Sequence, residues 1–439
     1  MALTRFFRGR DSPPPPLANV EPDDTTDVVG EDAPDDAEPE VDTDIERGWR
    51  HRAEALLPTG ASTGSKRADA LYGRGGDGPT HFVSARGAYL VTVDGARLLD
   101  CTMALGAVSL GYAEPRVTRA VVDAASEGNV SALSSWREVE LAERLCAMIP
   151  CAERAQLLKT GAEATTAAVR LARAYTGRTG VIACGYFGWH DWSSSSPGVP
   201  AVVQGEVTTV AFDDITALEA AVAASSASLA AIVIEPVVER APSIEWLRRA
   251  RELCDASGAA LIFDEVKTGL RVAPGGYQEL SGVTPDLASF GKALANGYPL
   301  AAVVGRAPLM EQARQSWISS TLASESTALA AALAVLDWHD EADICATLGE
   351  TGREMRDAVD RAITASGTPG VHTEGIDAMW LLRWNDAAAE RRFLHEAVQA
   401  GVLFKRGAYN FAAVAHDEEA LRAIEAAASA AFVAMREET

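Results

Sequence analysis

SFGKALANGYPL occupies residues 289–300, and the expected fold is built outward from this segment. Lys292 stands there between an aromatic-glycine pair and a run of small residues. Two apolar runs lie upstream and each ends in a carboxylate, AIVIE at 231–235 and ALIFD at 260–264. Such runs are typical of parallel strands that are buried on both faces. Since ligands of open α/β sheets bind beyond the strand ends, Glu235, Asp264 and Lys292 are candidate site residues.

The pairing of an acid at a strand end with a lysine in a later loop suits one cofactor. Pyridoxal phosphate needs a lysine amine for its Schiff base and a carboxylate beside its pyridine nitrogen. Taken alone, Lys292 is more simply a surface lysine, and the two acids are strand ends solvated by loops. The surrounding motifs decide between these readings.

DEVKTGLR at 264–271 and FGK at 290–292 make the chain resemble the class III aminotransferases. Within that class it is most similar to relatives of glutamate-1-semialdehyde aminomutase, from about residue 55 to about residue 435. The resemblance implies an α/β protein of pyridoxal-phosphate fold type I, like aspartate aminotransferase. A large domain with a mostly parallel central sheet would be joined to a small α+β C-terminal domain.

The expected division of the chain follows from this resemblance and from composition. Residues 1–45 form an acidic tail, 46–100 an N-terminal segment that packs with the small domain, 101–337 the large cofactor-binding domain and 338–439 the small C-terminal domain. The tail holds few large apolar residues, so we expect it to be disordered. A partner-binding arm is the less favoured alternative to a solvated tail.

Composition excludes several classes of partner. With 439 residues and a formal charge of −23, the chain lacks the basic balance that nucleic acids and anionic membranes require. It has no run of about 18 apolar residues that would span a membrane. The six cysteines show no metal-binding or disulfide spacing, which suggests reduced thiols in the cytoplasm and no metal site.

The N-terminal segment bears on the substrate. We expect a short amphipathic helix at about 45–57, a polar loop at 60–67 and an antiparallel meander at 81–100. In the aminomutase relatives that loop carries an arginine for a substrate carboxylate, and Lys66 takes its place here. Lysine keeps the charge but loses the bidentate fork, and a solvent-facing lysine is equally compatible. Leu105 stands where those relatives have a tryptophan.

The phosphate of the cofactor is expected at the helix that begins near residue 161. Thr160 and Glu163 have the spacing of a capping box, and amides at a helix start bind anions. The family usually has a hydroxyl residue at the position of Ala162. Its absence leaves the amides of Gly161 and Ala162 as the expected phosphate donors.

The resemblance also places residues around the pyridine ring. Tyr186 would stack on one face of the ring and Val266 would pack on the other. Glu235 would belong to the hydrogen-bond network around them. Phe187 stands where the family often has histidine, so no acid–base role is expected there.

Asp264 and Lys292 would carry the chemistry. A carboxylate beside the ring nitrogen keeps that nitrogen protonated, because it favours the charged form. Lys292 would form the Schiff base, be displaced by the amino donor and then move the proton as a general base.

Two further residues come from the segment SSTLASES at 319–326. By resemblance, Thr321 reaches the cofactor phosphate of a neighbouring subunit, so the protein would be a homodimer with shared active sites. Glu325 replaces an asparagine and is a candidate substrate residue. Ser324 would cap the helix that follows. Lys405 and Arg406 could reach a substrate anion, but solvated loop cations are the favoured interpretation.

We therefore predict a pyridoxal 5'-phosphate-dependent aminotransferase that moves an amino group from an amino-acid donor to a ketone or aldehyde acceptor. The first alternative is an intramolecular aminomutase, which would use the same residues, and a decarboxylase is also possible. The rival from another class is a cofactor-free scaffold whose binding element is the acidic tail. Such a scaffold would have no need of both Asp264 and Lys292.

Overall fold

The computed structural model describes residues 43–437. Most of the expected acidic tail, 1–42, lies outside the described residues. Residues 43–45 were assigned to that tail, but they begin helix α1 (Thr43–Leu56). Within 43–437 no helix is both long and apolar enough to cross a membrane.

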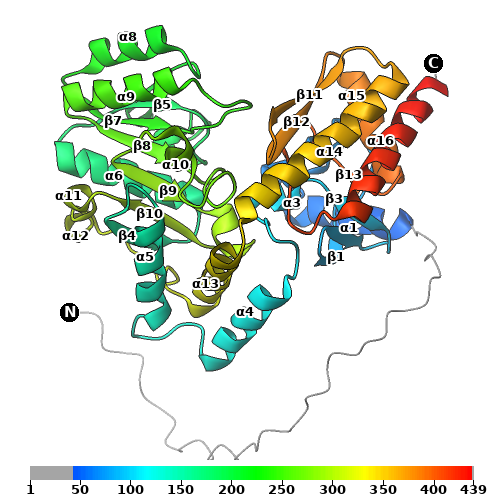
Figure 1. Cartoon of the computed structure of the whole chain (residues 1–439), viewed down its shortest axis with the longest axis horizontal. Helices are drawn as coiled ribbons and strands as arrows, with labels where there is room; N and C mark the ends of the chain where they lie inside the picture. The colour runs from blue at the N-terminus through cyan, green and yellow to red at the C-terminus, as the bar shows by residue number, and fades with distance from the viewer. Residues whose placement is uncertain (1–42, 438–439) are drawn as a thin grey trace, which may run out of the picture. The chain divides into compact units, whose positions relative to one another are not determined.

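A seven-stranded sheet organises the middle of the chain (Figure 1). Its order is β4 (Arg154–Leu158), β10 (Ala301–Gly305), β9 (Leu287–Phe290), β8 (Ala260–Asp264), β7 (Leu229–Ile234), β5 (Gly180–Cys184) and β6 (Val207–Thr209). Strands β6, β5, β7, β8 and β9 are parallel neighbours, and β10 runs antiparallel to β9 and β4. The two apolar runs that end in carboxylates are the adjacent parallel strands β7 and β8, as predicted.

Both faces of this sheet are covered by helices, which explains why its inner strands β5, β7 and β8 are apolar without alternation. On one face, Ile262 packs in the cluster that contains the apolar side of α6 (Gly161–Thr176). On the other face, Leu261 and Phe263 pack with Trp246 of α9 (Ile244–Ser257). The strand ends therefore lie at the edges of a dry three-layer core.

Further helices connect the strands or lead into and out of the sheet. They are α3 (Met103–Gly106), α4 (Pro115–Glu127), α5 (Trp136–Met148), η2 (Asp191–Ser193), α7 (Ala201–Gln204), α8 (Ile215–Ser225), α10 (Tyr277–Ser281), η3 (Lys292–Ala295), α11 (Ala307–Met310), α12 (Ala313–Ser316) and α13 (Ser326–Glu341). Helix α13 runs through the boundary expected between residues 337 and 338, and its helical hydrogen bonding ends at Ala342.

The N-terminal segment forms a second sheet. After α1 come η1 (Gly64–Lys66) and α2 (Ala68–Tyr72), then the antiparallel strands β1 (Phe82–Arg86), β2 (Tyr89–Thr92) and β3 (Arg97–Asp100). The predicted meander is present. Strand β13 (Val402–Leu403) pairs in parallel with β3, which supports our proposal that residues 46–100 be grouped with the small domain.

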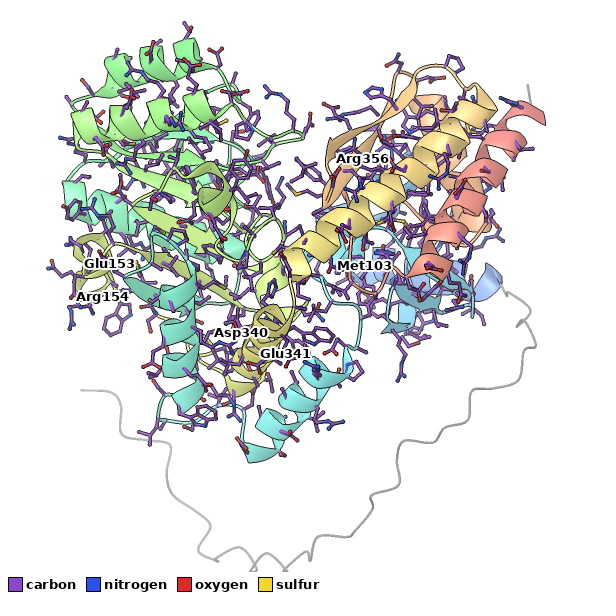
Figure 2. All side chains as sticks on the ribbon, in the orientation of Figure 1. Met103, Glu153, Arg154, Asp340, Glu341 and Arg356 are labelled. Carbon is purple, nitrogen blue, oxygen red and sulfur yellow. The ribbon has the colours of Figure 1, made fainter. Side chains whose placement is uncertain are left out.

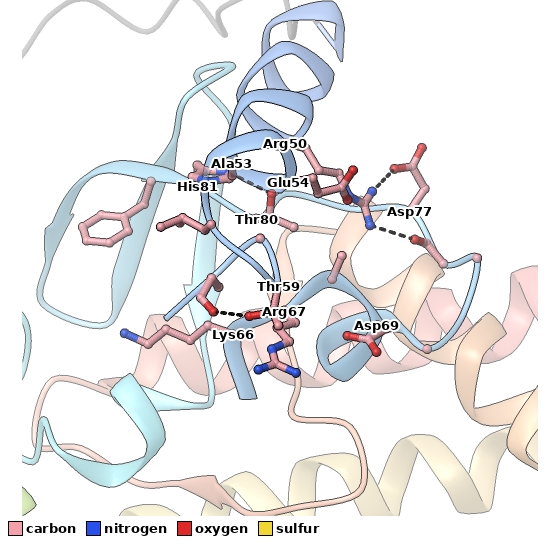
Figure 3. A pocket seen from close by; sticks show the side chains of 18 residues that line it. Arg50, Ala53, Glu54, Thr59, Lys66, Arg67, Asp69, Asp77, Thr80 and His81 are labelled. Carbon is pink, nitrogen blue, oxygen red and sulfur yellow. Dashed lines mark hydrogen bonds and ion pairs between the residues drawn. The ribbon is translucent and has the colours of Figure 1, made fainter. Parts of the chain in front are cut away.

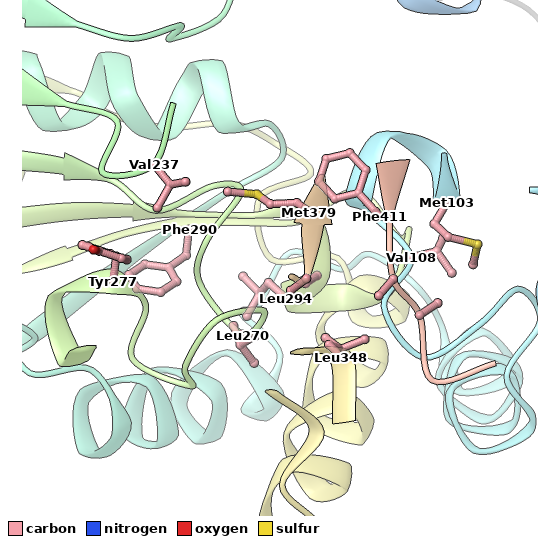
Figure 4. Close-up of a cluster of buried hydrophobic side chains, with 14 of the residues drawn as sticks. Met103, Val108, Val237, Leu270, Tyr277, Phe290, Leu294, Leu348, Met379 and Phe411 are labelled. Atoms are coloured by element: carbon pink, nitrogen blue, oxygen red, sulfur yellow. The ribbon is translucent and has the colours of Figure 1, made fainter. Parts of the chain in front are cut away.

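The C-terminal part has a small sheet of its own, with β11 (Val371–Ile376), β12 (Met379–Trp384) and β14 (Asn410–Phe411). Helices α14 (Ile344–Ser366), α15 (Ala387–Gln399) and α16 (Glu418–Glu437) complete it. One apolar cluster continues from the large sheet into this part (Figure 4): Phe290 and Leu294 belong to the same cluster as Leu348, Met379 and Phe411.

Candidate active site

The candidate residues gather because five strands end at one edge of the large sheet. The ladders of β5, β7, β8 and β9 place the ends of these strands in register to within a residue. Strand β4 also ends there, opposite the start of antiparallel β10. The residues that follow the strands include Gly161, Tyr186, Glu235 and Lys292, with Asp264 as the last residue of β8. The structure thus brings together five of the residues predicted from the sequence.

Asp264 is a buried carboxyl with two hydrogen-bond partners. Thr165 Oγ1 lies 3.0 Å from Asp264 Oδ2, and the amide of Val266 donates to Oδ1 over 3.0 Å. Burial and the nearby Glu235 carboxylate raise the pKa of Asp264 to about 7, although both hydrogen bonds oppose the shift. Thr165 Oγ1 also lies 2.8 Å from Gly161 O, and one hydroxyl hydrogen cannot serve both acceptors. A further positive charge beside Asp264 would favour its ionised form.

Lys292 begins η3 in a left-handed conformation, with φ of 49°. Desolvation, together with the nearby charge of Lys267, lowers the pKa of its amine to about 8, although Glu235 and Asp264 act in the opposite direction. An amine with this pKa is uncharged in an appreciable fraction near neutral pH, which is what a nucleophile or general base requires. A left-handed φ at a non-glycine residue is costly, and such conformations concentrate at functional sites.

Glu235 is the centre of a small polar network. Its Oε1 pairs with Lys267 Nζ at 2.6 Å, and its Oε2 accepts the amide of Tyr186 at 3.0 Å. The carboxylate therefore fixes the first turn of the loop after β5. Gly185 has φ of 130°, and a Cβ there would lie 2.4 Å from Glu235 Cβ, so only glycine allows this approach.

The start of α6 offers two amides to an anion. The predicted capping box is present: Thr160 accepts from Glu163 N, and Glu163 Oε2 accepts from the amides of Lys159 and Thr160. The amides of Gly161 and Ala162 occupy the first helical positions, which have no acceptor within the helix. They remain available as donors, and the helix dipole favours a negative ligand.

Two glycines near the start of α6 allow close contacts between neighbouring segments. A Cβ on Gly188, which has φ of 92°, would lie 2.5 Å from Ala162 Cβ, so the loop after β5 rests on the start of α6. A Cβ on Gly161 would lie 2.9 Å from Val266 Cγ1. Tyr186 is 74% exposed, whereas Phe187 is buried against Trp192. Tyr186 thus presents an open aromatic face beside the amides.

These groups fit pyridoxal phosphate. The site combines an amine of lowered pKa, a buried carboxyl that a pyridinium would ionise, open amides at a helix start and an exposed aromatic ring. No cluster of three or more metal-ligating side chains occurs in residues 43–437.

Comparison with known proteins identifies the family, because residues 72–415 match the class III aminotransferases. The chain belongs to that family. The 3-aminobutyryl-CoA aminotransferase of Cloacimonas acidaminovorans (strain Evry) is 35% identical over 303 residues, 67% of this chain and 73% of that protein. The glutamate-1-semialdehyde 2,1-aminomutase of Opitutus terrae (strain DSM 11246 / JCM 15787 / PB90-1) is 34% identical over 417 residues, 86% and 97% of the two chains.

A solved structure agrees with this membership. The FumI protein of Sphingopyxis sp. MTA144, in its pyridoxal-phosphate form, superposes with a TM-score of 0.85 at 26% identity over 90% of this chain and 97% of that one. Fold type I and the pyridoxal phosphate cofactor are thereby confirmed, and so is the activity class, pyridoxal-phosphate-dependent amino transfer.

In this aminotransferase the segment before α13 departs in part from the sequence-based expectation. Glu325, and not Ser324, is the N-cap of α13, and it accepts from the amides of Thr327 and Ala328. Its Oε1 also pairs with Lys159 Nζ at 2.8 Å. The carboxylate thus orders the start of α13, and the expected contact of Glu325 with substrate stays a prediction. Thr321 is exposed in the single chain.

Lys66 lies where two cavities meet. A cavity of about 910 Å³ lies between α1 and the loops 59–69 and 73–82, and Figure 3 shows Lys66 extending away from the Arg50–Asp77 ion pair. A second cavity, of about 170 Å³, is lined by Lys66, Leu105 and Lys405 among others. Lys66 and Leu105, the two positions that the family resemblance linked to the substrate, thus border the same cavity.

Lys405 was expected to be a solvated loop cation, and this expectation is wrong. It is buried, and its Nζ donates to the carbonyls of Ser65 and Ala70 over 3.2 and 3.3 Å. Burial, with a smaller contribution from Arg406, lowers the pKa of this lysine. Its neighbour Arg406 pairs with Glu390 at 3.4 Å. Sequence reasoning failed here because the small-domain loop folds under the N-terminal segment, a long-range contact that no local pattern reveals.

Four residues around the site were not singled out from the sequence. Thr165 and Lys267 contact Asp264 and Glu235, as described above. Asn296, just after η3, accepts from the amides of Ser109 and Leu110 and so connects the loop that holds Lys292 to the segment after α3. Arg271 is fully buried and donates to Gly106 O. The motif DEVKTGLR contained two of them, but nothing in it indicated their partners.

Helix α3 is a left-handed turn. Met103, Ala104 and Leu105 have φ of 42°, 50° and 61°, and Gly106 follows at 79°. Left-handed geometry costs non-glycine residues roughly 1–2 kcal/mol each and is rarely repeated. The turn is held by burial of Met103, marked in Figure 2, and by the Arg271 bond to Gly106 O. It presents Ala104 and Leu105 to the smaller cavity.

Proposed function

We propose that Lys292 bonds the cofactor aldehyde and carries protons, that Asp264 holds the ring nitrogen protonated, and that the amides of Gly161 and Ala162 hold the phosphate. Pyridoxal phosphate supplies an aldehyde that captures amines and a ring that delocalises the electrons left by proton removal. The observation that carries this assignment is the placement of Lys292 and Asp264 at one sheet edge with opposite pKa shifts. Tyr186 and Val266 would enclose the ring from its two faces.

The chain's own groups explain how protons would move. An uncharged Lys292 can accept a proton from the carbon beside the substrate amine and return it elsewhere. A further positive charge favours the ionised form of Asp264, and a protonated ring nitrogen supplies one. The substrates we propose are an amino-acid donor and a ketone or aldehyde acceptor.

The test is a trapping experiment followed by a donor screen. Borohydride should fix the cofactor to Lys292 and to none of the other four lysines, Lys66, Lys159, Lys267 and Lys405, as read by peptide mapping. Wild-type enzyme should lose its visible absorption band on addition of a productive amino donor and release the keto product. Lys292→Ala should do neither. A label on Lys267 or Lys159 would overturn the assignment.

The second candidate is an intramolecular aminomutase. It is supported by the similarity to the Opitutus terrae aminomutase, which extends over 97% of that protein. Lys66 and Leu105 differ from the residues that the resemblance associates with glutamate-1-semialdehyde, and this favours the aminotransferase. An aminomutase would isomerise its amino-aldehyde without exchanging nitrogen with an isotopically labelled donor, whereas an aminotransferase would exchange it.

We also propose a homodimer with shared active sites. Thr321 and Leu322 are exposed at the start of α13, where Ser326 N donates to Asn129 O. The segment after Asn129 exposes Leu133 and Trp136, at 82% and 62%. Adjacent exposed apolar side chains of this size favour a protein partner. A second copy would cover them and place Thr321 near a phosphate.

For the cell compartment we propose the cytoplasm. All six cysteines lie in the described residues and are free, and five of them are buried. Free buried thiols are typical of reducing compartments. Fractionation of the native host, with the protein outside the cytosolic fraction, would contradict this proposal.

A further inference from the structure

The chain uses lysine sparingly, with five lysines among its 39 basic residues. Four of them already have a place around the site. Lys292 is the candidate catalytic amine, Lys159 precedes α6, and Lys66 and Lys405 border the smaller cavity. The fifth, Lys267, follows Val266 in the loop after β8, and neither the proposed chemistry nor the family resemblance gives it a role.

Lys267 sits at the junction of three segments. Its Nζ lies 2.6 Å from Glu235 Oε1 at the end of β7, and both side chains are largely buried, at 13% and 7% exposure. The same ammonium lies 4.1 Å from the ring centroid of Tyr409, in the loop between β13 and β14. Tyr409 Oη in turn accepts the amide of Glu239 at 2.6 Å. One lysine therefore connects two strand ends of the large sheet with a loop of the small domain.

This position affects the aromatic loop as well. The second oxygen of Glu235 accepts the amide of Tyr186, so Lys267 restrains the carboxylate that restrains Tyr186. A buried ion pair of this kind is costly to break from one side, because the remaining charge stays buried without a partner. Loss of the ammonium would release both the loop and the contact with Tyr409.

The pair also sets the charges that Lys292 experiences. The charged groups that face Lys292 are Lys267, Glu235, Asp264 and Arg271. Without Lys267, Glu235 would be a second uncompensated carboxylate in the same buried space as Asp264. Two unpaired acids would draw a proton onto Lys292 and onto each other.

We propose that Lys267 is a positioning residue whose ammonium neutralises Glu235 and contacts the ring of Tyr409. Glu235 can then hold the amide of Tyr186 in place. Asp264 is left as the unpaired carboxylate beside Lys292. The inference rests on the proposed role of Lys292. It goes beyond that role, because it assigns a function to a residue that would touch neither substrate nor cofactor.

The test follows the titration of Lys292 in the cofactor-free protein. Competitive acylation with isotopically labelled acetic anhydride, read lysine by lysine in peptides, gives the pH midpoint of each amine. For wild type the Lys292 midpoint is expected at about pH 8. Lys267→Met should move it upward by at least half a pH unit, and Lys267→Arg should leave it near the wild-type value. Glu235→Gln should move it downward, since Lys267 then stands without its anion.

The double variant Lys267→Met/Glu235→Gln should return the midpoint toward wild type, because it removes both charges. Arg356→Met is the matched control, since Arg356 pairs with Asp377 at 3.1 Å on α14, outside the site (Figure 2). It should change no lysine midpoint. The cofactor-loaded enzyme gives a second reading, because the pH at which its visible band changes should shift in the same direction.

The proposal fails if Lys267→Met leaves the Lys292 midpoint unchanged, or if Lys267→Arg shifts it equally. If Lys267→Met does not fold, the sign of the Glu235→Gln shift decides, and an upward shift or none overturns the proposal. Borohydride trapping on another lysine would instead overturn the proposed function. The two failures are thus distinguishable.

Discussion

Asp264 shows how burial can prepare a side chain for a ligand. Its carboxyl ends a strand that is covered on both faces, and it competes with Gly161 O for the hydroxyl of Thr165. Burial and the nearby Glu235 carboxylate therefore keep this carboxyl protonated up to about pH 7 in the folded, cofactor-free protein. In the unfolded chain it ionises near its ordinary value of 3.8.

The resulting pH dependence has a definite sign. The raised pKa means that the folded state binds one more proton than the unfolded state between about pH 4 and pH 7. Asp264 thus stabilises the cofactor-free fold at low pH, and this contribution of up to a few kcal/mol is lost as the pH rises through 7. Asp264→Asn has no carboxyl to ionise and should not lose this stability. The melting temperature of the variant minus that of wild type should therefore increase between pH 5 and pH 7.5. An unchanged difference would contradict the raised pKa.

The same variant tests catalysis. With the carboxylate gone, the ring nitrogen is no longer held protonated, and turnover should fall by about 100-fold or more, as for the loss of other pre-placed electrostatic groups. Cofactor binding should persist, because the phosphate amides and Lys292 are unchanged. Single-turnover kinetics with a productive donor would measure the loss. A rate near that of wild type would remove Asp264 from the mechanism.

At this scale the sequence predicted which residues lie at the site better than it predicted their partners. Asp264 and Lys292 could be predicted because their motifs resemble a family and because each follows an apolar strand. The ion pairs Lys267–Glu235 and Lys159–Glu325 could not, since each joins residues far apart in the chain. The cap of α13 was expected at Ser324, whereas the side chain of Glu325 forms it.

At the scale of elements, the loop after β5 depends on its glycines. Gly188→Ala would place a Cβ 2.5 Å from Ala162 Cβ at a φ of 92°. The overlap and strain cost about 1–3 kcal/mol and should push the loop away from the phosphate amides. We expect cofactor affinity to fall about tenfold or more, because 1.4 kcal/mol corresponds to a factor of ten. Fluorescence titration of the cofactor-free protein would measure it.

Gly198→Ala is the matched control for this prediction. Gly198 has a similar φ of 99°, but a Cβ there would meet nothing within 4 Å. It should carry the backbone strain and leave cofactor affinity within about twofold, since the strain lies away from the phosphate amides. Equal losses in both variants would show that strain alone, and not the contact with Ala162, is responsible.

The left-handed turn α3 makes a second prediction about an element. Ala104 has φ of 50°, a conformation that glycine adopts without penalty. Ala104→Gly should therefore raise the free energy of unfolding by up to about 1 kcal/mol. Ala220→Gly, at an exposed position inside α8, should lower it by about 1 kcal/mol, because glycine weakens a right-handed helix. Urea denaturation of both variants would compare them, and equal losses would contradict the strain at Ala104.

No sequence pattern indicated this turn. Residues 103–106 read MALG, and their composition would suit an ordinary helix start. Contacts with the rest of the protein hold the turn in its left-handed conformation. Met103 is buried, and Arg271 donates to Gly106 O. Gly106 also lies so close to Phe411 that a Cβ on it would be 2.6 Å from Phe411 Cε1. Long-range packing has overridden local preference here, as it often does at functional sites. Strands β7 and β8, by contrast, followed directly from their apolar runs.

At the scale of the whole molecule, the proposed dimer determines where an active site is complete. If Thr321 serves the partner's phosphate, each site combines Lys292 of one chain with Thr321 of the other. Thr321→Glu would bring a carboxylate against the phosphate dianion, and like charges repel strongly in a partly buried site. Homodimers of Thr321→Glu should then bind cofactor poorly, and homodimers of Lys292→Ala should be inactive.

A mixed dimer of the two variants tests this sharing directly. One of its sites carries both defects. The other takes Lys292 from the Thr321→Glu chain and Thr321 from the Lys292→Ala chain, so all of its groups are intact. Separately tagged chains, co-expressed and purified through both tags, should recover about half of the wild-type activity per dimer if the sites act independently. Inactive mixed dimers would place Thr321 in its own subunit's site or in none, because complementation requires that the two defects fall in the same site.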